Sequence, residues 1–145
     1  MRLTQHTDYA LRTLIFLGVK GEAQSTIEEI SKGHGISRNH LMKVVQRLVS
    51  EGYVESRRGV GGGIRLAKAP SEIVIGDVVR RLEPDLGLAE CFRPGNACVL
   101  TPVCALSPLL DKALQAFLSE LDQASLEDLI TPAGHKSLAL RMRIR

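Results

Sequence analysis

Apolar residues recur at intervals of three and four over most of the chain, and this spacing predicts a mainly helical protein. The first third predicts three helices: one from Thr4 to about Lys20, a short one opened by a capping box of Ser25 with Glu28 or Thr26 with Glu29, and one from about Arg38 to Glu51. The third helix has apolar residues at offsets 0, 3, 4, 7 and 8 from Leu41. This pattern indicates one buried face and one polar face.

Two short strands are predicted next, Tyr53–Arg57 and Ile64–Lys68, joined by a turn with four glycines at 59, 61, 62 and 63. Glycine clusters supply the positive φ angles that tight hairpins need. A dinucleotide-binding loop would need a helix after its glycines, whereas the residues here, IRLAK, alternate as a strand. Helices around a tight turn followed by a hairpin predict a winged helix-turn-helix, mainly α with a small β-hairpin wing.

The second half predicts a two-turn helix ended by Pro84, a Gly- and Pro-rich loop, and a long amphipathic helix from Leu106 to Leu121. The long helix has apolar residues at offsets 0, 3, 4, 7, 8, 11, 12 and 15. Such a stripe packs either on its own domain or on a second copy, and we expect a homodimer. The predicted organisation is 1–84, winged helix-turn-helix domain; 85–105, cysteine-bearing loop; 106–145, dimerisation helix and a basic tail that is ordered, frayed or in contact with DNA.

Composition narrows the class of protein. The chain has 145 residues, 44 % hydrophobic and only 3 % aromatic, so the predicted core is aliphatic and helices are favoured over a β-sandwich. No apolar run approaches the ~20 residues of a membrane span. The first residues, MRLTQHTDYALR, lack the features of a secretory signal. We therefore expect a cytoplasmic protein.

Charge is unevenly distributed, which bears on the partner. Residues 37–68 hold seven basic and two acidic residues, whereas 69–135 hold four basic and ten acidic ones. A compact basic block favours contact with a polyanion, although a solvated charged face is the alternative. We expect the third helix and the hairpin to bind double-stranded DNA. The candidate DNA-binding residues are Arg38, Asn39, His40, Lys43, Gln46, Arg57, Arg58, Gly61, Gly62 and Arg65.

Three cysteines, Cys91, Cys98 and Cys104, lie in the predicted loop with spacing C-x6-C-x5-C. An odd number of clustered cysteines favours metal binding or redox chemistry over a disulfide framework. Zinc sites prefer C-x2-C pairs, so the wide spacing favours an iron–sulfur cluster, with structural zinc and inert or disulfide-forming thiols as alternatives. The spacing leaves the fourth ligand open among Asp8, His6, Glu90 and an external molecule.

Several segments together resemble one family. HTDYALR, ISRNHLMKVVQRLVSEGYVESRRGVGGGIRLAK, IGDVVRRLEP and the three cysteines before a long helix are similar to the iron–sulfur-cluster-dependent winged-helix transcription regulators over about residues 1–130. TDYALR, SRNHLMKVVQRL and AFLSELDQASLEDLI resemble the nitric-oxide-sensitive repressor branch most. The tail after Thr131 matches nothing in the family pattern.

The resemblance implies a homodimeric repressor that binds a palindromic operator and releases it when a [4Fe-4S] or [2Fe-2S] cluster reacts with nitric oxide. It implies Cys91, Cys98 and Cys104 as cluster ligands and Asp8, given by the partner subunit, as the fourth. The family's cluster-assembly regulators have a histidine shortly after the third cysteine, whereas residues 105–108 here read ALSP.

Two other functions remain open. One is an iron- or cluster-status sensor on the same fold, and the other, from another class, is a thiol or redox protein with a winged-helix scaffold. The sequence carries no paired carboxylates in a glycine-bounded site and no plausible Ser/His/Asp set, so we expect no enzyme.

Overall fold

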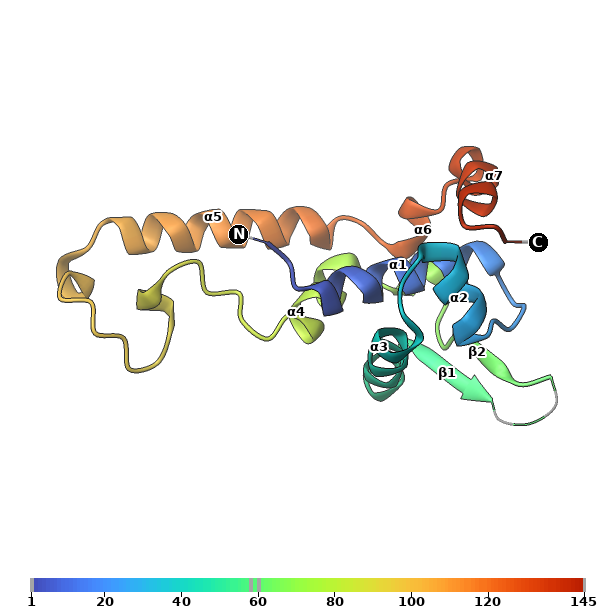
Figure 1. Ribbon diagram of the computed structural model, residues 1–145. Helices are drawn as coiled ribbons and strands as arrows, with labels where there is room; N and C mark the ends of the chain where they lie inside the picture. The colour runs from blue at the N-terminus through green and yellow to red at the C-terminus, as the bar shows by residue number, and fades with distance from the viewer. Residues whose placement is uncertain (1, 58, 60, 145) are drawn as a thin grey trace.

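The computed structural model describes residues 2–57, 59 and 61–144, which are mainly helical with one antiparallel hairpin (Figure 1). This confirms the predicted fold class, a winged helix-turn-helix with a long C-terminal helix. The elements are α1 (Gln5–Lys20), α2 (Ile27–His34), α3 (Arg38–Ser50), β1 (Val54–Arg57), β2 (Gly63–Leu66), α4 (Ile75–Leu82), α5 (Leu106–Asp122), α6 (Leu126–Leu129) and α7 (Pro132–Arg141).

The helix-turn-helix is fixed by its caps. Of the two capping boxes considered, the structure forms the one of Thr26 and Glu29, in which the Glu29 carboxylate accepts from the Thr26 amide at 2.7 Å. Gly35 ends α2 at φ 66°, a left-handed conformation that glycine adopts without strain. The Ser37 hydroxyl then accepts from the His40 amide and opens α3. The turn between α2 and α3 is therefore set by local sequence.

The hairpin is joined to the body of the domain by its second strand. β1 and β2 pair from Val54 opposite Leu66 to Arg57 opposite Gly63, a slightly shorter ladder than the sequence predicts. Ile64 exchanges two backbone hydrogen bonds, of 2.8 and 2.9 Å, with Ser25 in the segment before α2. A Cβ atom at Gly63 would lie 2.8 Å from the Ser25 carbonyl oxygen, so this close approach requires glycine.

The core is built around α1. Leu14, Phe16 and Leu17 are almost completely buried, and α1 contacts α2, α3, α4, α6, α7 and β2. In Figure 1, α1 runs through the middle of the domain, with α3 and the hairpin on one side and α6 and α7 on the other. α3, the second helix of the helix-turn-helix, is thus positioned by α1.

α5 extends away from this domain as an arm (Figure 1), and its apolar stripe is divided in two. Leu114 and Leu118, 7 % and 5 % exposed, pack in a second small core with Val79 of α4. Leu106 and Leu109, nearer the cysteine segment, are 57 % and 62 % exposed. The expectation that the whole stripe faces a second copy therefore fails at Leu114 and Leu118, because α4 already covers them.

The chain after α5 returns to the first core. Leu126 of α6 is fully buried, and its amide donates to the Ile73 carbonyl at 2.8 Å. In α7, His135 Nε2 donates to the Val19 carbonyl at 2.9 Å, and Met142, just after the helix, is buried. Of the three arrangements considered for the tail, its described residues adopt the ordered one, on the side of α1 opposite α3.

This packing predicts that the C-terminal helices and the helix-turn-helix unfold together. Leu126→Ala is expected to lower the free energy of unfolding by about 2–5 kcal/mol, since it leaves a cavity in the main core. Leu129→Ala on the same helix, where the side chain is 41 % exposed, is the matched control and is expected to cost less than about 1 kcal/mol. Urea denaturation followed by circular dichroism measures both. Equal losses for the two variants would contradict the assignment of Leu126 to the main core.

Candidate nucleic-acid interface and metal centre

α3 separates its polar and apolar residues onto opposite faces. Its buried face comprises Leu41, Val44, Val45 and Leu48, which pack in the main core. The side chains predicted to bind DNA all lie on the exposed face: Arg38, Asn39, His40, Lys43 and Gln46. Long polar side chains on the exposed face of a second helix-turn-helix helix suit contact with base edges and phosphates.

The predicted DNA-binding residues of the hairpin, unlike those of α3, differ from one another in their surroundings. Arg57 is exposed at the end of β1, and Gly61 and Gly62 lie in the turn. Arg58 falls outside the described residues. Arg65 is held between two carboxylates, with Nε 2.5 Å from Glu55 Oε1 on the opposite strand and Nη1 3.5 Å from Glu22 Oε2. The hydrogen bond to Glu55 raises the pKa of the Arg65 guanidinium, so Arg65 is charged but already paired.

The structure adds three residues that the sequence pattern did not suggest. Gln5, His6 and Tyr9 of α1 lie beside α3, and the rings of Tyr9 and His40 have centroids 6.2 Å apart. About 30 residues separate these positions from α3 in the chain, so periodicity and local motifs carried no signal for the contact.

The three cysteines lie in the irregular segment between α4 and α5. All three are free thiols, and each is partly exposed. Among the described residues of this segment, the regular structure consists of two short 3₁₀ turns, Glu90–Phe92 and Thr101–Val103. Within residues 2–57, 59 and 61–144, no three His, Cys, Asp or Glu side chains converge on a metal position. The chain fold by itself therefore does not assemble the predicted ligands.

The donor set nevertheless suits the predicted group. Three unpaired thiols on a segment with little secondary structure can be brought together without unfolding a helix or strand, and thiolates are the ligands of iron–sulfur clusters. Glu90 lies in this segment, where its carboxylate accepts from the Ala97 amide at 3.0 Å. The segment could thus hold a cluster by its chemistry.

Asp8 lies elsewhere. It stands in the first turn of α1, with its Oδ2 2.7 Å from Arg12 Nη2 and its Oδ1 3.0 Å from Arg12 Nε. Figure 1 places the start of α1 apart from the cysteine segment, which lies at the far end of α5. His6 is on the same turn of α1 as Asp8. One chain therefore keeps these two candidate ligands away from its own cysteines.

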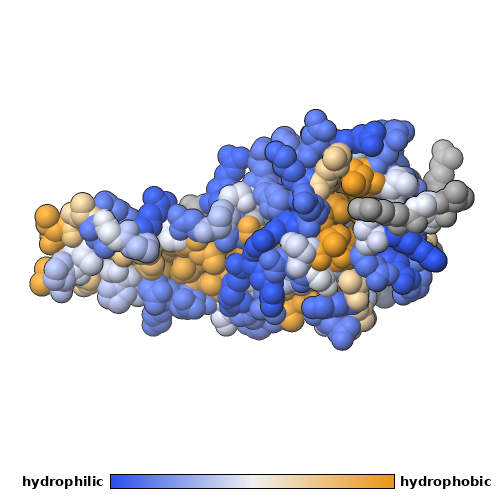
Figure 2. Space-filling view, turned by 90° about the horizontal axis from the view of Figure 1, so that it is seen from below, coloured by the Kyte–Doolittle hydropathy of each residue, from blue (hydrophilic) through white to orange (hydrophobic). Residues whose placement is uncertain are grey.

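The arm, here taken as α5 together with the cysteine segment at its outer end, carries apolar surface. Figure 2 shows hydrophobic side chains along the narrow part of the molecule. The large hydrophobic residues exposed there are Val99, Leu100, Val103, Leu106 and Leu109. A search of the described residues finds no helix with the length and hydropathy of a membrane span.

Comparison with known proteins assigns the family. The model of the Rrf2 family, described as an iron-dependent transcriptional regulator, matches residues 3–132. The chain belongs to the Rrf2 family. The HTH-type transcriptional regulator NsrR of Bacillus licheniformis is 50 % identical over 137 residues, covering 93 % of this chain and 96 % of that protein. NsrR of Geobacillus kaustophilus is 54 % identical over 132 residues, 90 % of each chain.

Solved structures agree on the fold. CymR, described as the global cysteine regulator of B. subtilis, superposes with a TM-score of 0.72 at 28 % identity, covering 89 % of this chain and 95 % of that one. IscR of T. potens gives a TM-score of 0.74 at 24 % identity, covering 92 % and 88 %. The resemblance to winged-helix regulators is confirmed, and the Rrf2 protein described here is a DNA-binding transcriptional regulator and not an enzyme.

The carboxylates around Arg65 should compete with DNA phosphates. Glu55→Gln is expected to raise affinity for DNA about two- to five-fold at low salt, because it frees Arg65 and removes a negative charge from the hairpin. In an Arg65→Ala background only the smaller gain from the lost negative charge should remain, which separates release of Arg65 from the general charge effect. Fluorescence anisotropy with a labelled duplex measures all three variants. An equal gain in both backgrounds would show that Arg65 takes no part.

Proposed function

We propose that this Rrf2 protein is a homodimeric repressor of transcription that binds a palindromic operator through α3 and the hairpin and releases it in response to nitric oxide, sensed by an iron–sulfur cluster on the loop cysteines. One observation carries the proposal: a chain about half identical to proteins named NsrR combines an exposed polar recognition helix with three free thiols on the adjoining arm.

Dimerisation is supported by the distal half of the arm. Its exposed leucines and valines form an apolar surface with no cover in the described chain, and such surfaces usually meet a partner. A twofold pair of arms would present two α3 helices to DNA about one helical turn, ~34 Å, apart. The operator is therefore expected to be an inverted repeat.

The cysteines and Asp8 would hold the cluster jointly. Cys91, Cys98 and Cys104 of one chain would supply three thiolates, and Asp8 of the second chain an oxygen ligand. When bound, the cluster supplies iron that reacts with nitric oxide, most readily where an oxygen ligand binds soft iron less firmly than sulfur.

Asp8 links this site to DNA through its own helix. Its carboxylate has to leave Arg12, its partner in this structure, before it can act as a ligand. A change of partner at Asp8 acts on α1, which packs directly against α3. A coupling of about 1–3 kcal/mol along this route would change DNA affinity roughly 5–150-fold.

Loss of base contacts tests the role of α3. Arg38→Ala and Asn39→Ala are each expected to weaken operator binding by about 1–3 kcal/mol and to relax specificity. Lys43→Ala should instead lower the slope of log affinity against log salt by about 0.9, one phosphate contact. Lys136→Ala on α7, opposite α3, is the control and should match the parent. Parent-like binding by all three α3 variants would refute the interface.

The exposed part of the arm tests dimerisation. A Leu106→Lys, Leu109→Lys double variant should be monomeric by sedimentation velocity, because charges replace the apolar contact while the leucines that pack on α4 stay intact. Leu129→Lys, an equally disruptive change at another exposed leucine, should remain dimeric. A monomeric parent protein at micromolar concentration would contradict the proposal.

Anaerobic purification followed by absorption spectroscopy tests the cluster. Replacing any one of Cys91, Cys98 and Cys104 with Ala should abolish the visible bands, whereas Asp8→Ala should keep them but change the spectrum or its response to nitric oxide. Arg12→Ala, which leaves the carboxylate in place, should retain the parent's ligand set. A parent-like response from Asp8→Ala would assign the fourth position to His6, Glu90 or an external molecule.

A further inference from the structure

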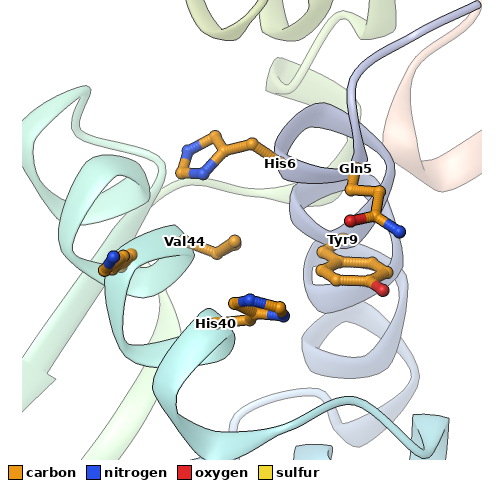
Figure 3. A pocket seen from close by; sticks show the side chains of 6 residues that line it. Gln5, His6, Tyr9, His40 and Val44 are labelled. Carbon is orange, nitrogen blue, oxygen red and sulfur yellow. The ribbon is translucent and has the colours of Figure 1, made fainter.

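A small open pocket lies between the first turns of α1 and α3 (Figure 3). Its volume is about 200 Å³, and its lining comprises Gln5, His6, Tyr9, His40, Lys43 and Val44. In Figure 3, His6 reaches from α1 toward α3, and His40 reaches from α3 toward the Tyr9 ring. Side chains from two helices thus point into one space.

The polar groups of this pocket lack partners. Within the described chain, the side chains of Gln5, His6, Tyr9, His40 and Lys43 form no hydrogen bond or ion pair with other protein groups, although the Arg12 guanidinium lies 5.9 Å from the centroid of the Tyr9 ring. Other polar side chains on the same turn of α1 are paired, since Thr7 bonds to Thr4 and Asp8 to Arg12. Gln5, His40 and Lys43 are exposed and His6 and Tyr9 are half-buried, so all five side chains are free to contact a ligand that enters the hollow on which they converge.

The chemistry of the lining selects an anion. An ammonium, an amide, a phenol and two imidazoles can all donate hydrogen bonds, and no carboxylate lines the pocket. Val44 and the Tyr9 ring contribute apolar walls. Such a site suits a group with several acceptor oxygens and a single negative charge, such as a phosphodiester.

The position of the pocket identifies the source of that group. His40 and Lys43 belong to the exposed face of α3 that is proposed to enter the major groove, so the pocket lies at the edge of this face. The two sugar–phosphate backbones border the major groove on either side of a recognition helix. A backbone phosphate is therefore the anion nearest to the pocket in the complex.

We propose that this pocket binds one backbone phosphate of the operator, which makes Gln5, His6 and Tyr9 of α1 DNA contacts in addition to α3 and the hairpin. The inference rests on the proposed binding of DNA through α3. The other candidate occupant is the cysteine segment of a second copy, but its most exposed side chains, Val99 and Val103, are apolar and complement a polar pocket poorly.

Neutral phosphate analogues provide a direct test. Each phosphate of the operator is replaced in turn by methylphosphonate, and affinity is measured by fluorescence anisotropy for the parent, Gln5→Ala and Tyr9→Phe. Tyr9→Phe removes only the hydroxyl and keeps the ring that packs beside His40. Gln123→Ala, at the end of α5 and outside the lining of the pocket, is the matched control for Gln5→Ala.

The parent is expected to lose about ten-fold in affinity at a phosphate bordering the α3 site, as for a hydrogen bond to a charged group. Gln5→Ala and Tyr9→Phe should each bind the natural operator about three-fold or more weakly than the parent does. When that same phosphate is replaced by methylphosphonate, their affinity should fall by a smaller factor than the affinity of the parent. The control should behave as the parent.

Two results would overturn the inference. One is that both variants keep the parent's affinity. The other is that replacing any phosphate by methylphosphonate lowers the affinity of the two variants by the same factor as that of the parent, so that the pocket serves a fold contact. Weaker dimers by sedimentation would support this second result and assign the pocket to a subunit contact. Arg38→Ala separates this failure from that of the proposed function: if Arg38→Ala binds the operator roughly 5–150-fold more weakly than the parent, α3 recognises DNA whatever the pocket does.

Discussion

The burial of α1 on nearly all its sides is the constraint on which the rest of this fold depends. Leu14, Phe16 and Leu17 face different neighbours, yet all are buried, and the buried Thr13 hydroxyl is satisfied by the Tyr9 carbonyl at 2.7 Å. A Cβ atom at Gly18 would lie 3.0 Å from Ile130 Cδ1, so α6 approaches the helix closely. The helices α2, α3, α4, α6 and α7 all contact α1, and α5 is attached to this group through α4.

This arrangement connects functions that are far apart in sequence. The first turns of α1 carry Asp8, the pocket beside α3 and the Arg12 backbone carbonyl, which accepts from His34 Nε2 at 3.1 Å at the end of α2. Burial lowers the pKa of His34, so its neutral ring is favoured at this junction. Both helices of the helix-turn-helix therefore meet the part of α1 where the proposed signal arrives. Because close-packed helices shift as units, a small change there would, under the proposed mechanism, be transmitted to the exposed face of α3.

The two halves of α5 lie in different surroundings. Its inner half is fastened to the domain by Leu114 and Leu118 and by the paired contacts of Arg80 with Asp122, at 2.5 and 2.7 Å. Its outer half leaves Leu106 and Leu109 exposed beside the cysteine segment. Because the inner half is held on the domain, a second chain that packs on the apolar outer half would have a fixed orientation relative to the first domain.

Sequence alone determined the elements and their caps, because helix periodicity, capping residues and turn glycines act over a few neighbouring positions. The polar face of α3 and the hairpin follow from such local patterns, whereas the structure chose the Thr26 capping box over the Ser25 one. Tertiary structure decided which apolar stripe is covered within the chain, that Arg65 is paired with Glu55 and Glu22, and that Gln5, His6 and Tyr9 adjoin α3. The Arg65–Glu55 pair follows from the register of the hairpin, whereas the other contacts join residues distant in the chain that the packing of the helices brings within reach of one another.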